Sequence, residues 1–198
     1  FFSFFKKEDF KKYRLYFFLI SIFFLGILIG KTHDDFEYYH FPYSLYLNSF
    51  ESIKGIGHLN HGFRTPSSIF YLNSIFNLPV IGQYTFSFGA GYYMIFANII
   101  LIDHLKNKVF KKNTFILFLS IFFLLFVNIF FYRIGEHGTD RSAQILILIL
   151  ILELFIFTNF KINFKYQFTL LVILTSLIVS LKSFYIIYFI FIFLVFDY

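Results

Sequence analysis

Acidic and histidine side chains gather in a short stretch that directly follows an apolar run. The stretch GKTHDDFEYYHFP, residues 30–42, contains the adjacent carboxylates Asp34 and Asp35 and, five residues further on, His40. A carboxylate at a membrane boundary is partly desolvated, which suits it to accept a proton. Two adjacent carboxylates also repel each other, and a bound divalent metal ion would relieve that repulsion. We therefore take Asp34 and Asp35 as candidate catalytic residues, with the metal ligands unknown.

A simpler alternative is that these acids only terminate a span and keep a loop hydrated. A second metal candidate is the HLNH pair, His58 and His61, whose i,i+3 spacing would let both grip one ion if the segment were helical. Glycines at positions 55, 57 and 62 favour a turn instead. Zinc has little support here, because the chain has no Cys and no third ligand in register.

Two other polar turns carry cations. The loop RIGEHGTDR, residues 133–141, combines acids with arginines, and Lys182 stands alone in LKSF. Arginine is well shaped for bidentate phosphate binding. The alternative is a charged connector whose pairs neutralise one another. The candidate substrate-binding residues from all these segments are His40, Glu136, His137, Asp140, Arg141 and Lys182.

Composition defines the setting of these residues. Of 198 residues, 59% are hydrophobic and 14% charged, with a mean hydropathy of +0.74. A soluble domain has roughly 45–50% apolar and about 25% charged residues. The chain is thus expected to be an integral membrane protein. The net charge of +6 does not indicate nucleic-acid binding, because the basic residues cluster between apolar runs.

A transmembrane helix needs about 20 mostly apolar residues. The last apolar stretch, 168–196, is long for one span and short for two, with Lys182 near its middle. A lysine at the bilayer centre costs at least about 2.5–3.5 kcal/mol, which favours two short helices that turn at LKSF. We expect an all-α, polytopic membrane protein with about five to six transmembrane helices in a single domain, 1–198. The earlier spans are expected at 13–30, 84–105, 114–132 and 142–158.

Positive charge predicts the orientation. Eleven Lys and Arg residues fall on one side of this topology and six on the other. The basic side, with the N-terminus, is expected to be cytoplasmic. Residues 31–79 then form an extracytoplasmic loop with interfacial helices, one near 36–50. The other is expected in TPSSIFYLNSIFNLP, with Thr65 as its cap and Pro66 at its first position.

The first span, the acidic stretch DDFEYYHFP and, more loosely, GEHGTDR and SLKSF resemble GT-C-type integral membrane glycosyltransferases. That superfamily includes protein O-mannosyltransferases, oligosaccharyltransferases and lipid A aminoarabinose transferases. The resemblance implies a sugar donor on a polyprenyl phosphate or diphosphate and transfer with inversion. Asp34 or Asp35 would activate the acceptor or hold a cation. The residues that would neutralise the leaving phosphate are His137, Arg141 and Lys182.

Members of this superfamily normally have more spans and often a soluble outer domain. The chain starts with Phe and stops directly after an apolar run, so we expect an N-terminal fragment. Alternatively, the chain belongs to a related bacterial membrane protein family with the same layout. The expected location is the bacterial inner membrane, with membrane lipids as further partners.

Two other functions remain open from the sequence. A transporter or flippase for a lipid-linked or small solute would place polar groups near the bilayer midplane. Here the spans are nearly bare of charge except for Glu153, which lies in the expected span 142–158. Polar residues instead gather at one face, which favours surface chemistry. The third possibility is a non-catalytic membrane protein that binds lipids or partners.

Overall fold

The computed structural model describes residues 7–29, 34–51, 54–78, 80–133, 138–160 and 163–193. All regular elements within these ranges are helices, apart from an isolated bridge between Leu78 and Gly82. This confirms the all-α class.

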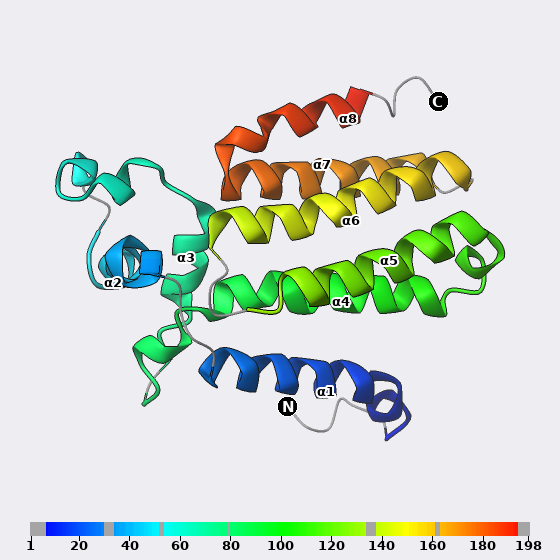
Figure 1. Cartoon of the computed structure of the whole chain (residues 1–198), viewed down its shortest axis with the longest axis horizontal. Coiled ribbons are helices and arrows are strands. Elements are labelled where there is room, and N and C mark those ends of the chain that lie inside the picture. Colours follow the sequence, from blue (N-terminus) through cyan, green and yellow to red (C-terminus); the bar gives the residue numbers. More distant parts are fainter. Residues whose placement is uncertain are drawn as a thin grey trace.

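Five long helices lie side by side and form the body of the molecule (Figure 1). Three of them, α4, α6 and α7, are long and apolar enough to cross a membrane. The 21 residues of α6 reach about 31 Å at 1.5 Å per residue, close to the hydrocarbon thickness of about 30 Å. The apolar part of α1 and all of α5 are shorter. The five helices are α1 (Lys7–Ile29), α4 (Phe88–Lys106), α5 (Thr114–Phe130), α6 (Thr139–Asn159) and α7 (Phe164–Leu181).

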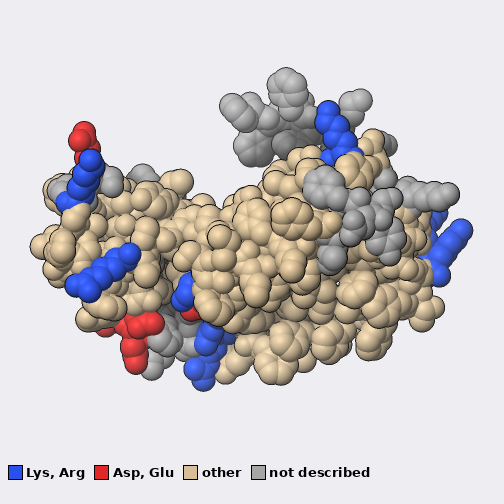
Figure 2. Space-filling model, turned by 90° about the horizontal axis from the view of Figure 1, so that it is seen from above, with Lys and Arg blue, Asp and Glu red and all other residues tan. Residues whose placement is uncertain are grey.

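One end of this bundle is covered by short helices, and we call it the capped end. The opposite end carries the Lys-rich loop 106–113, and we call it the basic end. On the face shown in Figure 2, acidic side chains are visible only toward the capped end, and the middle is formed mainly by uncharged residues. The cap consists of η2 (Phe36–His40), α2 (Phe41–Ser49), η3 (Ile56–His58), η4 (His61–Arg64), α3 (Ser68–Ile75) and η5 (Gln83–Thr85).

Helices occur at both expected interfacial segments, but the predicted start of the second was wrong. The N-cap of α3 is Ser67, whose Oγ accepts a hydrogen bond from the backbone N–H of Ile69. Thr65 and Pro66 precede the helix. Ser67 is favoured because its hydroxyl also donates to the carbonyl oxygen of Leu181 at 2.6 Å. The Ser67 side chain thus caps the first turn of α3 and also ties the cap to the bundle.

The stretch from 168 onward turns where the sequence predicted. Helix α7 ends at Leu181, and the chain continues as the 3₁₀ helix η8 (Ser183–Phe189) and α8 (Ile190–Phe193), which run back beside α7 (Figure 1). Lys182 is the residue between them, with an extended backbone at φ −148°. Its side chain therefore lies at the capped end rather than in the middle of a span.

Small and amide side chains set the contacts of α4. A Cβ added to Gly89 would overlap the side chain of Asn73, so α3 can approach α4 only because Gly89 has none. Further along, Asn128 of α5 donates to the amide oxygen of Asn98 at 2.7 Å. Lipid tails are as apolar as leucine, so close packing and such hydrogen bonds specify helix pairs in membranes. Gly89 thus sets how closely α3 packs on α4, and the Asn98–Asn128 pair links α4 to α5.

Glu153 belongs to a buried network near the basic end. One carboxylate oxygen lies 3.1 Å from Nε2 of His104, and the other accepts a hydrogen bond from Nε2 of Gln167 at 2.9 Å. The three residues come from α6, α4 and α7, and Glu153 is only 6% exposed. A buried carboxylate is costly unless it is paired and hydrogen-bonded. The network satisfies this carboxylate and joins three helices.

We predict that Glu153→Leu lowers the free energy of unfolding by about 1–3 kcal/mol, because His104 and Gln167 lose a buried partner. Glu153→Gln should lower it less, since an amide still bonds to both. Thermal unfolding in detergent measures the difference, with Thr158→Ala at the exposed end of α6 as control. Wild-type stability in Glu153→Leu would contradict the structural role.

Candidate functional site

A turn of π-helix lies at the centre of the acidic stretch. Residues Phe36–His40 form this turn, and the backbone N–H of Phe41 donates to the carbonyl oxygen of Phe36, five residues back. Pro42 explains the widening. Its ring would clash with the carbonyl of residue 38 in a regular helix, and it has no N–H to donate. A wider turn relieves the clash and changes the direction in which residues 36–40 point.

The carbonyl of Tyr38 finds another partner in the cap. Asn60 donates to it from Nδ2 at 3.2 Å, while the Oδ1 atom of Asn60 accepts from the backbone N–H of Gly62 at 2.8 Å. The Asn60 side chain thus satisfies the carbonyl of Tyr38, which Pro42 cannot reach with an N–H, and it also caps η4. The loop KGIGHLNHG is therefore folded onto the π turn, and its role here is structural.

Two glycines allow the side chains of the π turn to pack closely. A Cβ on Gly62 would overlap the ring of Tyr39. A Cβ on Gly138 would stand 2.5 Å from Cε1 of His40. Tyr39 is therefore held by the cap, and His40 by the segment that leads into α6. The His40 ring is buried and also lies 5.2 Å from the ring of Phe70 on α3, between centroids.

These contacts create a cavity of about 140 Å³ at the capped end. Asp35 is half-buried at its wall, whereas the neighbouring Asp34 is exposed and does not line it. Residues from the start of α6 form the other wall. The cavity is lined by Asp35, Tyr39, His40, Gly138, Thr139, Asp140 and Arg141. It brings together two acids, one guanidinium and one phenol from segments about a hundred residues apart.

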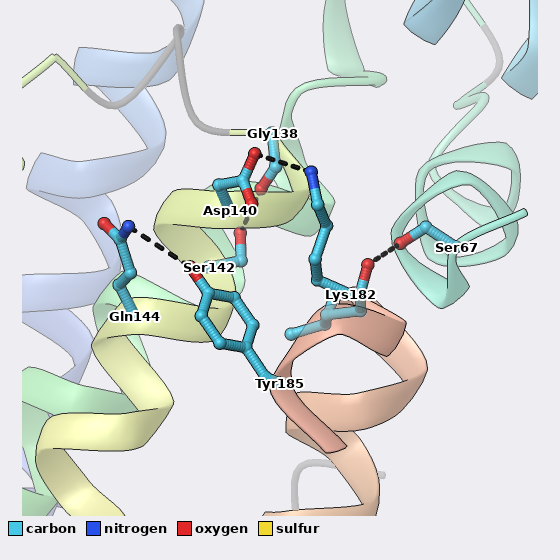
Figure 3. A network of polar contacts seen from close by, with 8 residues as sticks. Ser67, Gly138, Asp140, Ser142, Gln144, Lys182 and Tyr185 are labelled. Atoms are coloured by element: carbon cyan, nitrogen blue, oxygen red, sulfur yellow. Dashed lines mark hydrogen bonds and ion pairs between the residues drawn. The ribbon is translucent and has the colours of Figure 1, made fainter. Parts of the chain in front are cut away.

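Lys182 reaches the cavity through Asp140. Its Nζ lies 2.9 Å from Oδ2 of Asp140, across the gap between the end of α7 and the start of α6 (Figure 3). Both side chains are about half exposed, and such a pair contributes only about 0.2–1 kcal/mol to stability. Its main consequence is geometric. It fixes the orientation of Asp140 and keeps a second cation at the edge of the cavity.

The end of α7 is held in place independently of this ion pair. Ser67 donates to the carbonyl of Leu181, as Figure 3 also shows, and the Oγ atoms of Ser68 and Ser180 lie 3.0 Å apart. On the other side, Gln144 donates to the hydroxyl of Tyr185 at 3.3 Å. The position of Lys182 thus depends on contacts with both α3 and α6.

The Tyr39 hydroxyl is partly buried and lies near two carboxylates. Burial and then the negative charges of Asp35 and Asp140 raise the pKa of Tyr39 above its usual range. Tyr39 therefore stays protonated at physiological pH. A protonated phenol beside two carboxylates is a hydrogen-bond donor for a hydroxyl or phosphate oxygen of a ligand.

A family model matches nearly the whole chain, but that family has no known activity. The model for a domain of unknown function, DUF8201, matches residues 1–197. The chain belongs to the DUF8201 family. No curated protein and no solved structure matches it. Assignments of chemistry to this DUF8201 member thus depend on the geometry of its own residues.

The structure brings together most of the predicted site residues that it describes. Asp35, His40, Asp140 and Arg141 line the cavity, and Lys182 contacts it through Asp140. Asp34 lies outside the lining. The predicted residues Glu136 and His137 lie outside the described part of the chain. Among the described residues, no group of three His, Cys, Asp or Glu side chains could hold a metal ion.

Sequence reasoning missed Tyr39, Gly138 and Thr139 as lining residues. Tyr39 follows Asp35 by four positions, a spacing that places two residues on one helical face. The sequence therefore carries a signal for Tyr39. Gly138 carries no such signal, because its contact with His40 joins segments that are distant in the sequence.

We predict that Gly138→Ala lowers the free energy of unfolding by about 1–3 kcal/mol, since its Cβ would push against the His40 ring. In a His40→Ala background the same change should cost much less, because the clash is gone. Thermal unfolding of the four proteins measures this coupling. The matched control background is His104→Ala near the basic end, where Gly138→Ala should keep its full cost. Equal losses in all backgrounds would refute the contact.

Proposed function

We propose that this chain carries the site of a GT-C-like membrane glycosyltransferase, which transfers a sugar from a polyprenyl-phosphate or diphosphate donor at the extracytoplasmic face. One observation carries the proposal: Asp35, from the acidic stretch, shares a cavity with Arg141, from the start of α6. A carboxylate and a guanidinium facing one small space suit an acceptor hydroxyl and a phosphate.

Each group has a distinct role in this proposal. Asp35 accepts the proton of the acceptor hydroxyl as its oxygen attacks the anomeric carbon. The bond between that carbon and the phosphate oxygen breaks, and the phosphate leaves with the bonding electrons. Arg141 binds the phosphate oxygens, and Lys182 adds positive charge when the phosphate competes with Asp140 for it. Attack opposite the leaving group inverts the configuration.

The size of the cavity limits what it holds. Pockets for drug-sized ligands are about 300–1,000 Å³, whereas this cavity has about 140 Å³. It therefore takes the reacting ends of donor and acceptor, while the polyprenyl chain lies along the apolar surface of the bundle. The position of the cavity at the end of membrane-length helices supports this arrangement.

A transporter has less support from the same structure. The polar groups within the helices are engaged with one another, as in the Glu153 network and the Asn98–Asn128 pair. Transport would need polar groups available to a solute near the midplane. The cavity at the capped end instead presents its charges at the bundle surface.

We predict that Asp35→Asn lowers the transfer rate by at least about 100-fold, because a general base contributes roughly 10²–10⁴-fold. Asp34→Asn is the matched control and should retain nearly full activity, since Asp34 lies outside the cavity. The assay follows a radiolabelled sugar from polyprenyl-phosphate donors into water-soluble or protein acceptors, in membranes containing the protein. Full activity in Asp35→Asn, at normal expression, would remove the proposed catalytic role.

Donor binding is tested separately. Arg141→Ala should weaken binding of polyprenyl phosphate by about 10-fold or more, the effect of losing a charge-assisted hydrogen bond of about 1.5–3 kcal/mol. Asp35→Asn should bind it at least as well as wild type, because one negative charge is gone. The measurement is isothermal titration in detergent. Unchanged affinity in Arg141→Ala would show that the phosphate lies elsewhere.

A further inference from the structure

An apolar turn projects from the cap beside the end of α1. After α3, the chain forms a tight loop in which the backbone N–H of Gly82 donates to the carbonyl of Leu78 at 2.8 Å. Figure 1 places this loop beside the capped end of α1, and η5, which follows it, contacts α1. At the tip of the loop, Val80 is fully exposed and Ile81 is partly exposed. The turn therefore presents aliphatic side chains that the described residues do not cover.

The base of the turn is held by the side chain of Thr85. Thr85 is completely buried, and its Oγ1 hydrogen-bonds to the carbonyl of Phe76 and lies 2.8 Å from that of Gly82. Val80 has φ +75°, a conformation that β-branched residues rarely adopt. Such a conformation persists when the surrounding contacts impose it. The fold holds the Val80 side chain outward at a local conformational cost.

The surroundings of the turn fit lipid. Residues 65–102 contain no Asp, Glu, Lys, Arg or His. Tyr84, next to the tip, is 69% exposed, and tyrosine is enriched at the headgroup level. The adjacent helix α1 also exposes an apolar stripe that extends to its capped end, formed by Phe18, Ile22, Leu25 and Ile29. The turn therefore continues the lipid-facing surface of the bundle.

We propose that Val80 and Ile81, exposed between α3 and η5, form a membrane anchor, which inserts into the boundary between headgroups and acyl chains at the capped end. Burial of apolar side chains at this depth holds interfacial segments in place. Because α3 directly precedes the turn and η5 follows it, the anchor sets the depth of the cap in the bilayer. This inference is independent of the proposed catalytic chemistry.

The chain has no Trp, so a single tryptophan reports its own surroundings. We expect Val80→Trp, in phosphatidylcholine vesicles, to show blue-shifted emission, quenching by lipids brominated near the headgroup end of the acyl chain, and protection from acrylamide. Ile173→Trp on the exposed face of α7 is the lipid-facing reference. Leu59→Trp, at another strongly exposed cap position, between His58 and Asn60, is the aqueous control.

Emission from Val80→Trp that matches Leu59→Trp, with acrylamide quenching and no quenching by brominated lipid, would overturn the anchor. Blue-shifted emission without quenching by brominated lipid would also overturn it, and would indicate a second copy or another protein at this surface. Ile81→Trp provides the same measurement should Val80→Trp fail to fold, with helix content by circular dichroism as the criterion.

Discussion

The cavity exists because the ring of His40 packs against Gly138, a residue without a side chain. This contact joins the segment after α1 to the residue that precedes α6, about a hundred positions away in the sequence. A larger residue at 138 would separate the walls that carry Asp35 and Arg141. The remaining contacts of the capped end, including the Lys182–Asp140 pair, then adjust the positions of charges around a space already formed.

The membrane part and the capped end satisfy polar groups in different ways. Within the bundle, Glu153 and the asparagine pair are satisfied by partners on neighbouring helices, as a medium without water requires. At the capped end, charges face a cavity open to ligands, and Tyr39 remains a donor between two acids. The bundle thus supplies a rigid frame, and the chemistry that we propose is confined to its surface.

The sequence predicted the apolar helices well, because a long run of apolar residues leaves little choice but a helix in lipid. Of the five to six spans expected, three helices in the described part of the chain, α4, α6 and α7, are long and apolar enough to cross a membrane. The turn at Lys182 was also predictable, since a lysine is too costly at the bilayer centre. The choice between Asp34 and Asp35 was not. Which of the two faces the cavity depends on how the π turn rotates the residues before it. Pro42 imposes this turn, and Asn60 stabilises it from a distant loop. The role of Gly138 was hidden for the same reason, since its partner is distant in sequence.

The assembly of the cavity is tested most directly by crosslinking, because the chain has no Cys of its own. A protein with Asp35→Cys and Asp140→Cys should form an intramolecular crosslink with a short bifunctional maleimide, detected by mass spectrometry of the digested protein. Asp35→Cys paired with Lys108→Cys, at the basic end, should not. Efficient single labelling of both cavity positions without a crosslink between them would contradict the shared cavity on which the account depends.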